Sequence, residues 1–200
     1  MVSLGEISGG NYDSQALAVS GDGSVVVGWV EPSYGTYEAF RWTAQTGMVA
    51  MGTLFDDPDS YATAVSYDGS VIVGYSSFAD GTEAFRWTAE TGMIGLGDLN
   101  GGSLNSRAMG VSKDGSVIVG SNGGEAVSWT EGAGWSDRGT ETHFGFLTGD
   151  VESEAHVVSA YGIVFVGYIH SYQSYFPVLD PYTRLIFLRF LSLYVLSLAV

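Results

Sequence analysis

Short apolar runs separated by polar, glycine-containing turns recur along most of the chain. One unit reads Ala-Val-Ser-Gly-Asp-Gly-Ser-Val-Val-Val-Gly over residues 18–28. Its β-branched residues favour extended strands, and Asp-Gly between two such runs is typical of a tight β-hairpin. The glycine accepts a positive φ at no steric cost, and the aspartate can hydrogen-bond within its own turn. The pattern predicts paired antiparallel strands.

The hairpin unit is repeated in register. It recurs at 64–74 and 110–120, with a degraded copy at 157–167. The serines before the turns, spaced by 46, 46 and 47 residues, are Ser20, Ser66, Ser112 and Ser159. A second element keeps step with them: Glu-Ala-Phe-Arg-Trp-Thr at 38–43 and 83–88, and Glu-Ala-Val-Ser-Trp-Thr at 125–130. An apolar stretch after it, Met48–Leu54 in the first copy, predicts a further strand.

Four short strands in about 46 residues match one blade of a β-propeller. The sequence therefore predicts an all-β fold, a propeller-like array of four-stranded antiparallel blades, with a β-solenoid as the alternative. Residues 1–168 would hold three full repeats and the degraded fourth. Because the smallest closed propellers have about four blades, we expect an incomplete ring, which additional blades from another chain could extend.

The last part of the chain, 169–200, does not follow the repeat. It contains no glycine, and its final 16 residues carry one charge, Arg189. That run is shorter than the roughly 20 apolar residues of a membrane-spanning helix. The segment is interpreted as the product of a truncated or frame-disrupted gene, with membrane contact or a buried terminal strand as alternatives. The first residues lack the basic and apolar regions of a secretory signal.

Composition narrows the classes of function. The 200 residues include 22 acidic and 7 basic ones, a net charge of −15, which disfavours nucleic acid as a partner. The absence of cysteine removes disulfides and thiol catalysis. His143, His156 and His170 follow no metal-ligand spacing. We expect no cofactor, with weak Ca²⁺ binding by a loop containing Asp56, Asp57 and Asp59 as the alternative.

The repeated motifs, together with Gly-Met-x-x-Leu-Gly-Asp-Leu-Asn-Gly-Gly at 92–102, resemble the HAF-type extracellular repeat of bacterial surface and secreted proteins. The histidine of the His-Ala-Phe motif is replaced by Glu38, Glu83 and Glu125. The resemblance implies a propeller, an extracellular or cell-surface location and, in some members, the passenger region of an autotransporter. It implies no common catalytic activity.

Three sets of residues stand out as candidates. The turn residues are expected to be structural: Asp22, Gly23, Asp68, Gly69, Asp114 and Gly115. The aromatic residues recurring on one strand face are expected to pack between blades, with an exposed sugar-stacking platform as the alternative: Phe40, Trp42, Phe85, Trp87 and Trp129. Less regular aromatic residues are candidates for ligand contact in variable loops: Trp29, Tyr34, Tyr37, Tyr61 and Tyr75.

The sequence therefore favours a non-catalytic binding or surface-interaction module, an adhesin-like part of an exported protein with a carbohydrate or protein ligand. No nucleophile or phosphate-binding motif is identified, and repeat equivalence explains the aligned carboxylates better than a catalytic pair does. The alternative is a propeller hydrolase or lyase acting on glycans.

Overall fold

The computed structural model describes residues 4–5, 7, 13–55, 59–97, 105–130, 140–143, 150–162, 164–171 and 189–190. The regular structure of these residues is entirely β, in four sheets. Sheet 1 contains β1 (Ser14–Val19), β2 (Val25–Ser33), β3 (Thr36–Thr43) and β4 (Gly47–Ala50). Sheet 2 contains β5 (Asp59–Val65), β6 (Ile72–Phe78), β7 (Gly81–Thr88) and β8 (Gly92–Gly95). Sheet 3 contains β9 (Ser106–Val111), β10 (Val117–Asn122), β11 (Glu125–Thr130) and β12 (Thr140–His143). Sheet 4 contains β13 (Asp150–Val158), β14 (Val164–Ser171) and the short β15 (Arg189–Phe190).

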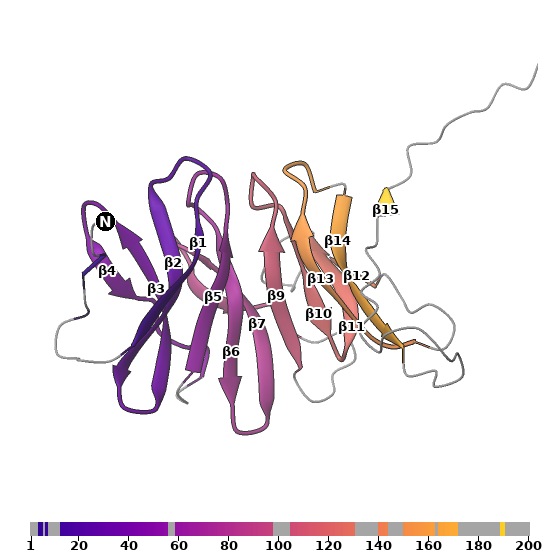
Figure 1. Ribbon diagram of the computed structural model, residues 1–200, viewed down its shortest axis with the longest axis horizontal. Coiled ribbons are helices and arrows are strands. Elements are labelled where there is room, and N and C mark those ends of the chain that lie inside the picture. The colour runs from indigo at the N-terminus through magenta and orange to yellow at the C-terminus, as the bar shows by residue number, and fades with distance from the viewer. Residues whose placement is uncertain are drawn as a thin grey trace, which may run out of the picture.

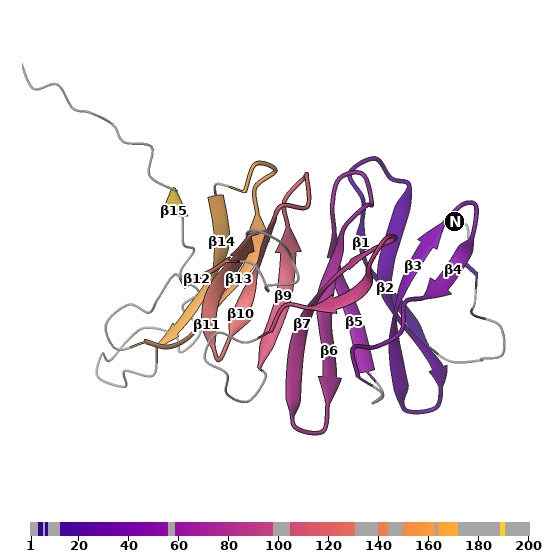
Figure 2. The same ribbon diagram turned by 180° about the vertical axis from the view of Figure 1, so that it is seen from behind.

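Each sheet is an antiparallel meander in which neighbouring strands follow one another in the chain. The sheets stand side by side in an open row, with sheet 1 and sheet 4 at opposite ends (Figures 1 and 2). This confirms the prediction of an all-β, propeller-like array of four-stranded blades. The strand expected over Met48–Leu54 ends earlier, at Ala50. Gly52 follows with a φ of 79°, outside the extended region, and Met51 and Leu54 pack against the core beyond the strand.

Neighbouring sheets pack through a repeated arrangement. The first strand of each sheet contacts the two middle strands of the preceding sheet: β5 against β2 and β3, β9 against β6 and β7, and β13 against β10 and β11. The first strands also contact one another along the array. The core therefore lies between sheets, so that each sheet depends on its neighbours for burial.

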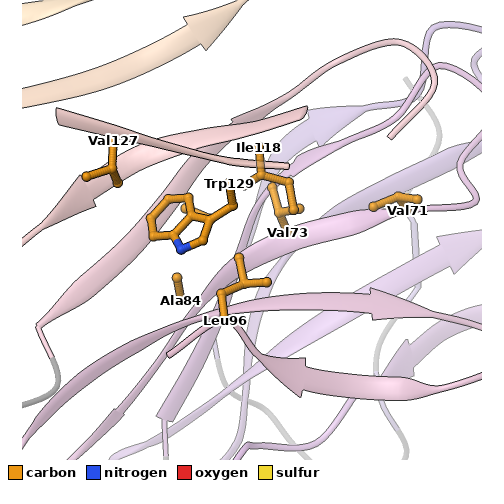
Figure 3. Packing of buried hydrophobic residues seen from close by; sticks show 8 residues of the cluster. Val71, Val73, Ala84, Leu96, Ile118, Val127 and Trp129 are labelled. Carbon is orange, nitrogen blue, oxygen red and sulfur yellow. The ribbon is translucent and has the colours of Figure 1, made fainter. Parts of the chain in front are cut away.

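The interface between sheets 2 and 3 is built around one tryptophan. Trp129 is fully buried, with Val73 of sheet 2, Leu96 just after β8 and Ile118 of its own sheet in the same cluster (Figure 3). No acceptor among the described residues lies within hydrogen-bond distance of its Nε1. The contribution of Trp129 is therefore apolar packing.

The other repeated aromatic residues differ in burial. Phe40 and Phe85 are fully buried, whereas Trp42 and Trp87 are half-buried. Trp87 packs against the cluster shared by sheets 1 and 2, and the guanidinium of Arg41, from sheet 1, lies 5.9 Å from its ring centroid. Arg41 of sheet 1 and Trp87 of sheet 2 thus form a cation–π contact between the two sheets.

In sheets 2, 3 and 4, a buried serine near the start of the first strand joins the sheet to the preceding one. Ser106 accepts a hydrogen bond from Ala84 N at 2.9 Å and donates one to the carbonyl of Gly97 at 2.9 Å. Ser60 makes the equivalent pair to Ala39 N and Gly52 O, at 2.8 and 2.6 Å. Ser153 accepts from Ala126 N at 2.8 Å. Each serine satisfies backbone groups that the neighbouring sheet leaves unpaired.

The glycine that ends the Val-(Val/Ile)-Val-Gly run has a steric role. The first strand of every sheet carries a one-residue irregularity opposite this glycine, as between Ala62 and Ala64 in sheet 2. A Cβ on Gly74 would overlap the carbonyl oxygen of Tyr61, and the same overlap occurs at Gly28, Gly120 and Gly167. The bulge brings the two backbones too close for a side chain.

Candidate functional site

Each Ser-x-Asp-Gly turn joins the first and second strands of a sheet and is hydrogen-bonded to the turn of the next sheet. The carboxylate of Asp68 accepts hydrogen bonds from Ser66 Oγ at 2.9 Å and from Ser70 N and Oγ at 3.0 and 2.7 Å. Asp22 and Asp114 accept the equivalent three bonds. These hydroxyl and amide donors hold the pKa of all three carboxyl groups below the ordinary 3.8.

The turns also contact one another across the sheets. Asp22 N donates to the Tyr67 carbonyl, Tyr67 N to the Lys113 carbonyl and Lys113 N to the Ala160 carbonyl, at 3.0–3.1 Å. The glycines Gly23, Gly69 and Gly115 have φ values of 71–75°. The structure thus places the turn residues in a hydrogen-bonded series within the scaffold. The aspartates are occupied by their own turns, which is typical of a structural role.

Four of the five candidate ligand-contact residues lie together on sheets 1 and 2. The rings of Tyr37 and Tyr61 stack with centroids 5.9 Å apart, and those of Tyr61 and Tyr75 stack at 5.1 Å. Trp29 meets Tyr37 edge-on at 5.2 Å and Tyr61 at 6.4 Å. All four side chains are half-buried. Tyr34 is 87% exposed at the β2–β3 turn.

The aromatic cluster is one half of a longer row of side chains. In each sheet, a residue of the first strand pairs across to the residue that follows the bulge glycine on the second strand. The four cross-strand pairs are Gln15–Trp29, Tyr61–Tyr75, Arg107–Ser121 and Glu154–Tyr168. We call these eight residues and Tyr37, nine in all, the inner row.

Contacts between neighbouring sheets make the inner row continuous. Trp29 meets Tyr61 of the next sheet, the guanidinium of Arg107 lies 5.5 Å from the Tyr75 ring centroid, and Ser121 Oγ donates to Glu154 Oε1 at 3.0 Å. In every case the second-strand residue of one sheet contacts the first-strand residue of the next. The inner row therefore crosses all four sheets.

At the far end of the inner row, a carboxylate lies beside an imidazole ring. Glu154 Oε2 lies 2.9 Å from His156 Nε2, and the His156 ring meets Tyr168 edge-on at 5.5 Å. From sheets 1 and 2 to sheets 3 and 4, the described side chains of the inner row change from neutral and mostly aromatic ones to a set that includes the charged Arg107 and Glu154. Such a gradient can orient an elongated ligand.

Three tyrosines of the inner row, Tyr61, Tyr75 and Tyr168, have raised pKa values and remain protonated at neutral pH. Burial, followed by the nearby Asp59 and the neighbouring tyrosines, raises the pKa of Tyr61 to about 12. Burial also raises the pKa of Tyr75, despite the opposing charge of Arg107, and that of Tyr168, where Glu154 adds to the effect. Their hydroxyl groups can therefore donate hydrogen bonds to a bound ligand.

Of the three aspartates in the expected calcium loop, the structure describes Asp59. Asp59 accepts a hydrogen bond from Tyr37 N at 3.0 Å, while Asp56 and Asp57 lie outside the described residues. Among the side chains that the structure describes, no three His, Asp or Glu residues are grouped as metal ligands would be. Weak Ca²⁺ binding by this loop therefore stays a prediction.

Sequence reasoning missed the residues of the inner row in sheets 3 and 4, and Gln15 in sheet 1. The sequence does mark one position of the row, because the residue after each bulge glycine differs between repeats: it is Trp29, Tyr75, Ser121 or Tyr168. A variable position beside an unvarying one marks a place where the repeats differ in surface chemistry.

Comparisons with known proteins bear on the fold. The sequence matches no family model and no curated protein. The structure is similar to a protein described as TolB from Agrobacterium tumefaciens, with a TM-score of 0.56 and 16% identity over 79% of this chain and 55% of that one. It is also similar to TolB from Acinetobacter baumannii, with a TM-score of 0.56 and 14% identity over 91% of this chain and 45% of that one.

These likenesses place the chain among β-propeller-like proteins. The chain spans about half the length of the solved structures it matches. Among the residues described, there is no helix of the length and apolar character needed to cross a membrane.

Proposed function

We propose that this chain is a non-catalytic binding module of an exported bacterial protein, and that it binds an extended carbohydrate along the inner row. The observation that carries the proposal is the continuous contact of Trp29, Tyr37, Tyr61 and Tyr75 across two sheets. Tyrosine and tryptophan side chains supply rigid apolar area together with a polar group. A sugar chain presents the complementary surface, apolar C–H groups and hydroxyl groups.

Charge restricts the class of carbohydrate. The protein has a net charge of −15, so its overall field repels polyanions. The protonated tyrosine hydroxyls can donate to neutral oxygen acceptors without an ionic partner. A neutral polysaccharide therefore suits the row better than an acidic one.

The HAF-type resemblance supports an extracellular or cell-surface location for this activity. A protein ligand is the competing partner, because rows of tyrosine also serve protein recognition. The two ligand classes make different demands, since a sugar chain follows the row whereas a protein would extend beyond it.

Binding to an array of neutral and acidic glycans, with a parallel screen for hydrolysis or lyase activity, tests the proposal. We expect neutral glycans to bind without turnover, Tyr61→Ala to lose this binding, and Tyr34→Ala to retain it, because Tyr34 lies outside the inner row. Turnover of a polysaccharide by the wild-type protein would instead establish the glycan-acting enzyme. Absence of glycan binding would reject the carbohydrate assignment.

A further inference from the structure

The first sheet exposes a surface that the other three sheets bury against a neighbour. Ser60, Ser106 and Ser153 are fully buried, and the equivalent Ser14 is exposed. The alanines Ala62, Ala108 and Ala155 are 0–3% exposed, and the equivalent Ala16 is exposed. Val158 is 9% exposed and its counterpart Val19 is 58% exposed. We call Ser14, Ala16, Val19 and Gly23 the leading face of sheet 1.

The turn glycines show what the leading face should contact. A Cβ built on Gly69 would strike Val25 of the preceding sheet; Gly115 meets Val71 in the same way, and Gly162 meets Val117. A Cβ on Gly23 meets nothing within 4 Å. A turn glycine therefore packs on a valine of the preceding sheet at three places inside the chain. At the leading face, Gly23 has no such valine beside it.

The other half of this contact is present at the opposite end of the array. Val166 of sheet 4 occupies the position of Val27, Val73 and Val119, all fully buried, whereas Val164 occupies that of Val25 and Val71, which are 2% and 4% exposed, and of the half-buried Val117. Both Val164 and Val166 are only half-buried. We call these two valines the trailing face of sheet 4.

Residues before β1 carry the repeat beyond the leading face. Leu4, Gly5 and Ile7 stand ten, nine and seven residues before Ser14, as Leu96, Gly97 and Leu99 stand before Ser106. Gly5 and Gly97 also share a positive φ, 87° and 79°. The segment before β1 thus repeats the sequence spacing, and one positive-φ glycine, of the segment that precedes β9.

We infer that the leading face of one copy binds the trailing face of a second copy of this chain. Gly23 of one copy would pack on Val164 of its partner, as Gly69 packs on Val25 inside the chain. The two faces lie at opposite ends of the open row, so one molecule in this arrangement does not bring its own faces together (Figures 1 and 2). The interaction is head-to-tail and does not depend on the inner row binding a ligand.

Head-to-tail contacts either close into a ring or continue into a filament. Two copies contribute eight sheets, and closed propellers have about four to eight blades. A dimer with two identical interfaces is therefore the expected assembly.

Sedimentation velocity over a range of protein concentrations, on the full chain, tests this inference. We expect the wild type to dimerise and Val19→Asp to weaken dimerisation at least about tenfold, because an unpaired carboxylate would enter an apolar interface. Val49→Asp is the matched control: Val49 is 49% exposed on β4, outside both faces, and this variant should dimerise like the wild type.

Mixing distinguishes head-to-tail association from a symmetric contact. Val164→Asp alone should be monomeric, and so should Val19→Asp alone. An equimolar mixture should recover a dimer, because one intact leading face and one intact trailing face remain. Circular dichroism confirms that each variant is folded. A monomeric wild type, a dimeric Val164→Asp variant or a mixture without dimer would overturn the inference.

Discussion

The hydrogen bonds of Ser106 to the preceding sheet give the sharpest test of what stabilises the contact between sheets 2 and 3. In Ser106→Ala the Ala84 amide loses its acceptor and the Gly97 carbonyl loses its donor, both at 2.9 Å in the wild type. Ala84 and Ser106 are fully inaccessible and Gly97 is buried, so water does not readily replace the hydroxyl. Each buried group left unpaired costs about 1–3 kcal/mol, so for the two groups together we expect a loss of about 2–6 kcal/mol in the free energy of unfolding.

Urea unfolding followed by both circular dichroism and tryptophan fluorescence measures this loss, since agreement of the two probes checks that the transition is cooperative. Ser14→Ala is the matched control, because Ser14 has the same position in the repeat but is exposed on β1. It should change stability by no more than about 0.5 kcal/mol. Equal losses in the two variants, or no loss in Ser106→Ala, would show that these hydrogen bonds do not stabilise the contact between sheets 2 and 3.

Three further predictions concern the scaffold. Trp129→Ala should cost about 3–5 kcal/mol in urea unfolding, whereas Trp129→Phe should cost clearly less because the indole N–H has no acceptor among the described residues. Gly74→Ala should lower the thermal midpoint more than Gly35→Ala, since the first overlaps the Tyr61 carbonyl and the second adds only about 1–2 kcal/mol of left-handed backbone strain in open space. The lowered pKa of Asp68 gives stability that is present above the unfolded value of 3.8 and is lost as pH falls through the folded pKa; Asp68→Asn should therefore flatten the acid limb of a melting-temperature profile. Equal costs for the two Trp129 variants, equal midpoints for the two glycine variants, or an unchanged acid limb would each contradict the corresponding argument.

The architecture could be predicted because the same turn and strand signals recur in each repeat. Asp-Gly between β-branched runs specifies a hairpin by itself, and β1–β2, β5–β6 and β9–β10 pair across such turns. The degraded copy keeps the turn without the aspartate: Tyr161 takes its place, and Gly162 still has a φ of 69°. The positive φ of the glycine is therefore the more general requirement.

The contacts between sheets could not be predicted in the same way. Ser60 and Ser106 are polar residues in strands, and nothing local indicates that a neighbouring sheet leaves an amide and a carbonyl for them to pair. Packing of Trp87 and Trp129 was expected, but their different burial depends on which residues the neighbouring sheet supplies. Such features follow from tertiary placement, which the periodicity of one strand does not contain.

Only part of the inner row could be predicted from the sequence, for the same reason. Aromatic side chains are conspicuous in a sequence, so Trp29, Tyr37, Tyr61 and Tyr75 could be selected as candidates. Their extension through Arg107 depends on cross-strand register and on the order of the sheets. Tyr34, selected by the same reasoning, lies exposed at the β2–β3 turn outside the row, because loop position alone does not determine which side chains meet.

The most direct test of ligand binding by the inner row is to follow the indole N–H resonances by two-dimensional NMR during titration with neutral tetra- to hexasaccharides. Trp29 Nε1 donates to Gln15 Oε1 at 3.2 Å within the row, whereas Trp129 is fully buried between sheets 2 and 3. Loss of one peak in Trp29→Phe and of another in Trp129→Phe assigns the two resonances. We predict a saturable shift of the Trp29 resonance with the Trp129 resonance unmoved. A Trp29 resonance unchanged by every oligosaccharide, or one that moves no more than that of Trp129, would contradict a carbohydrate site on the inner row.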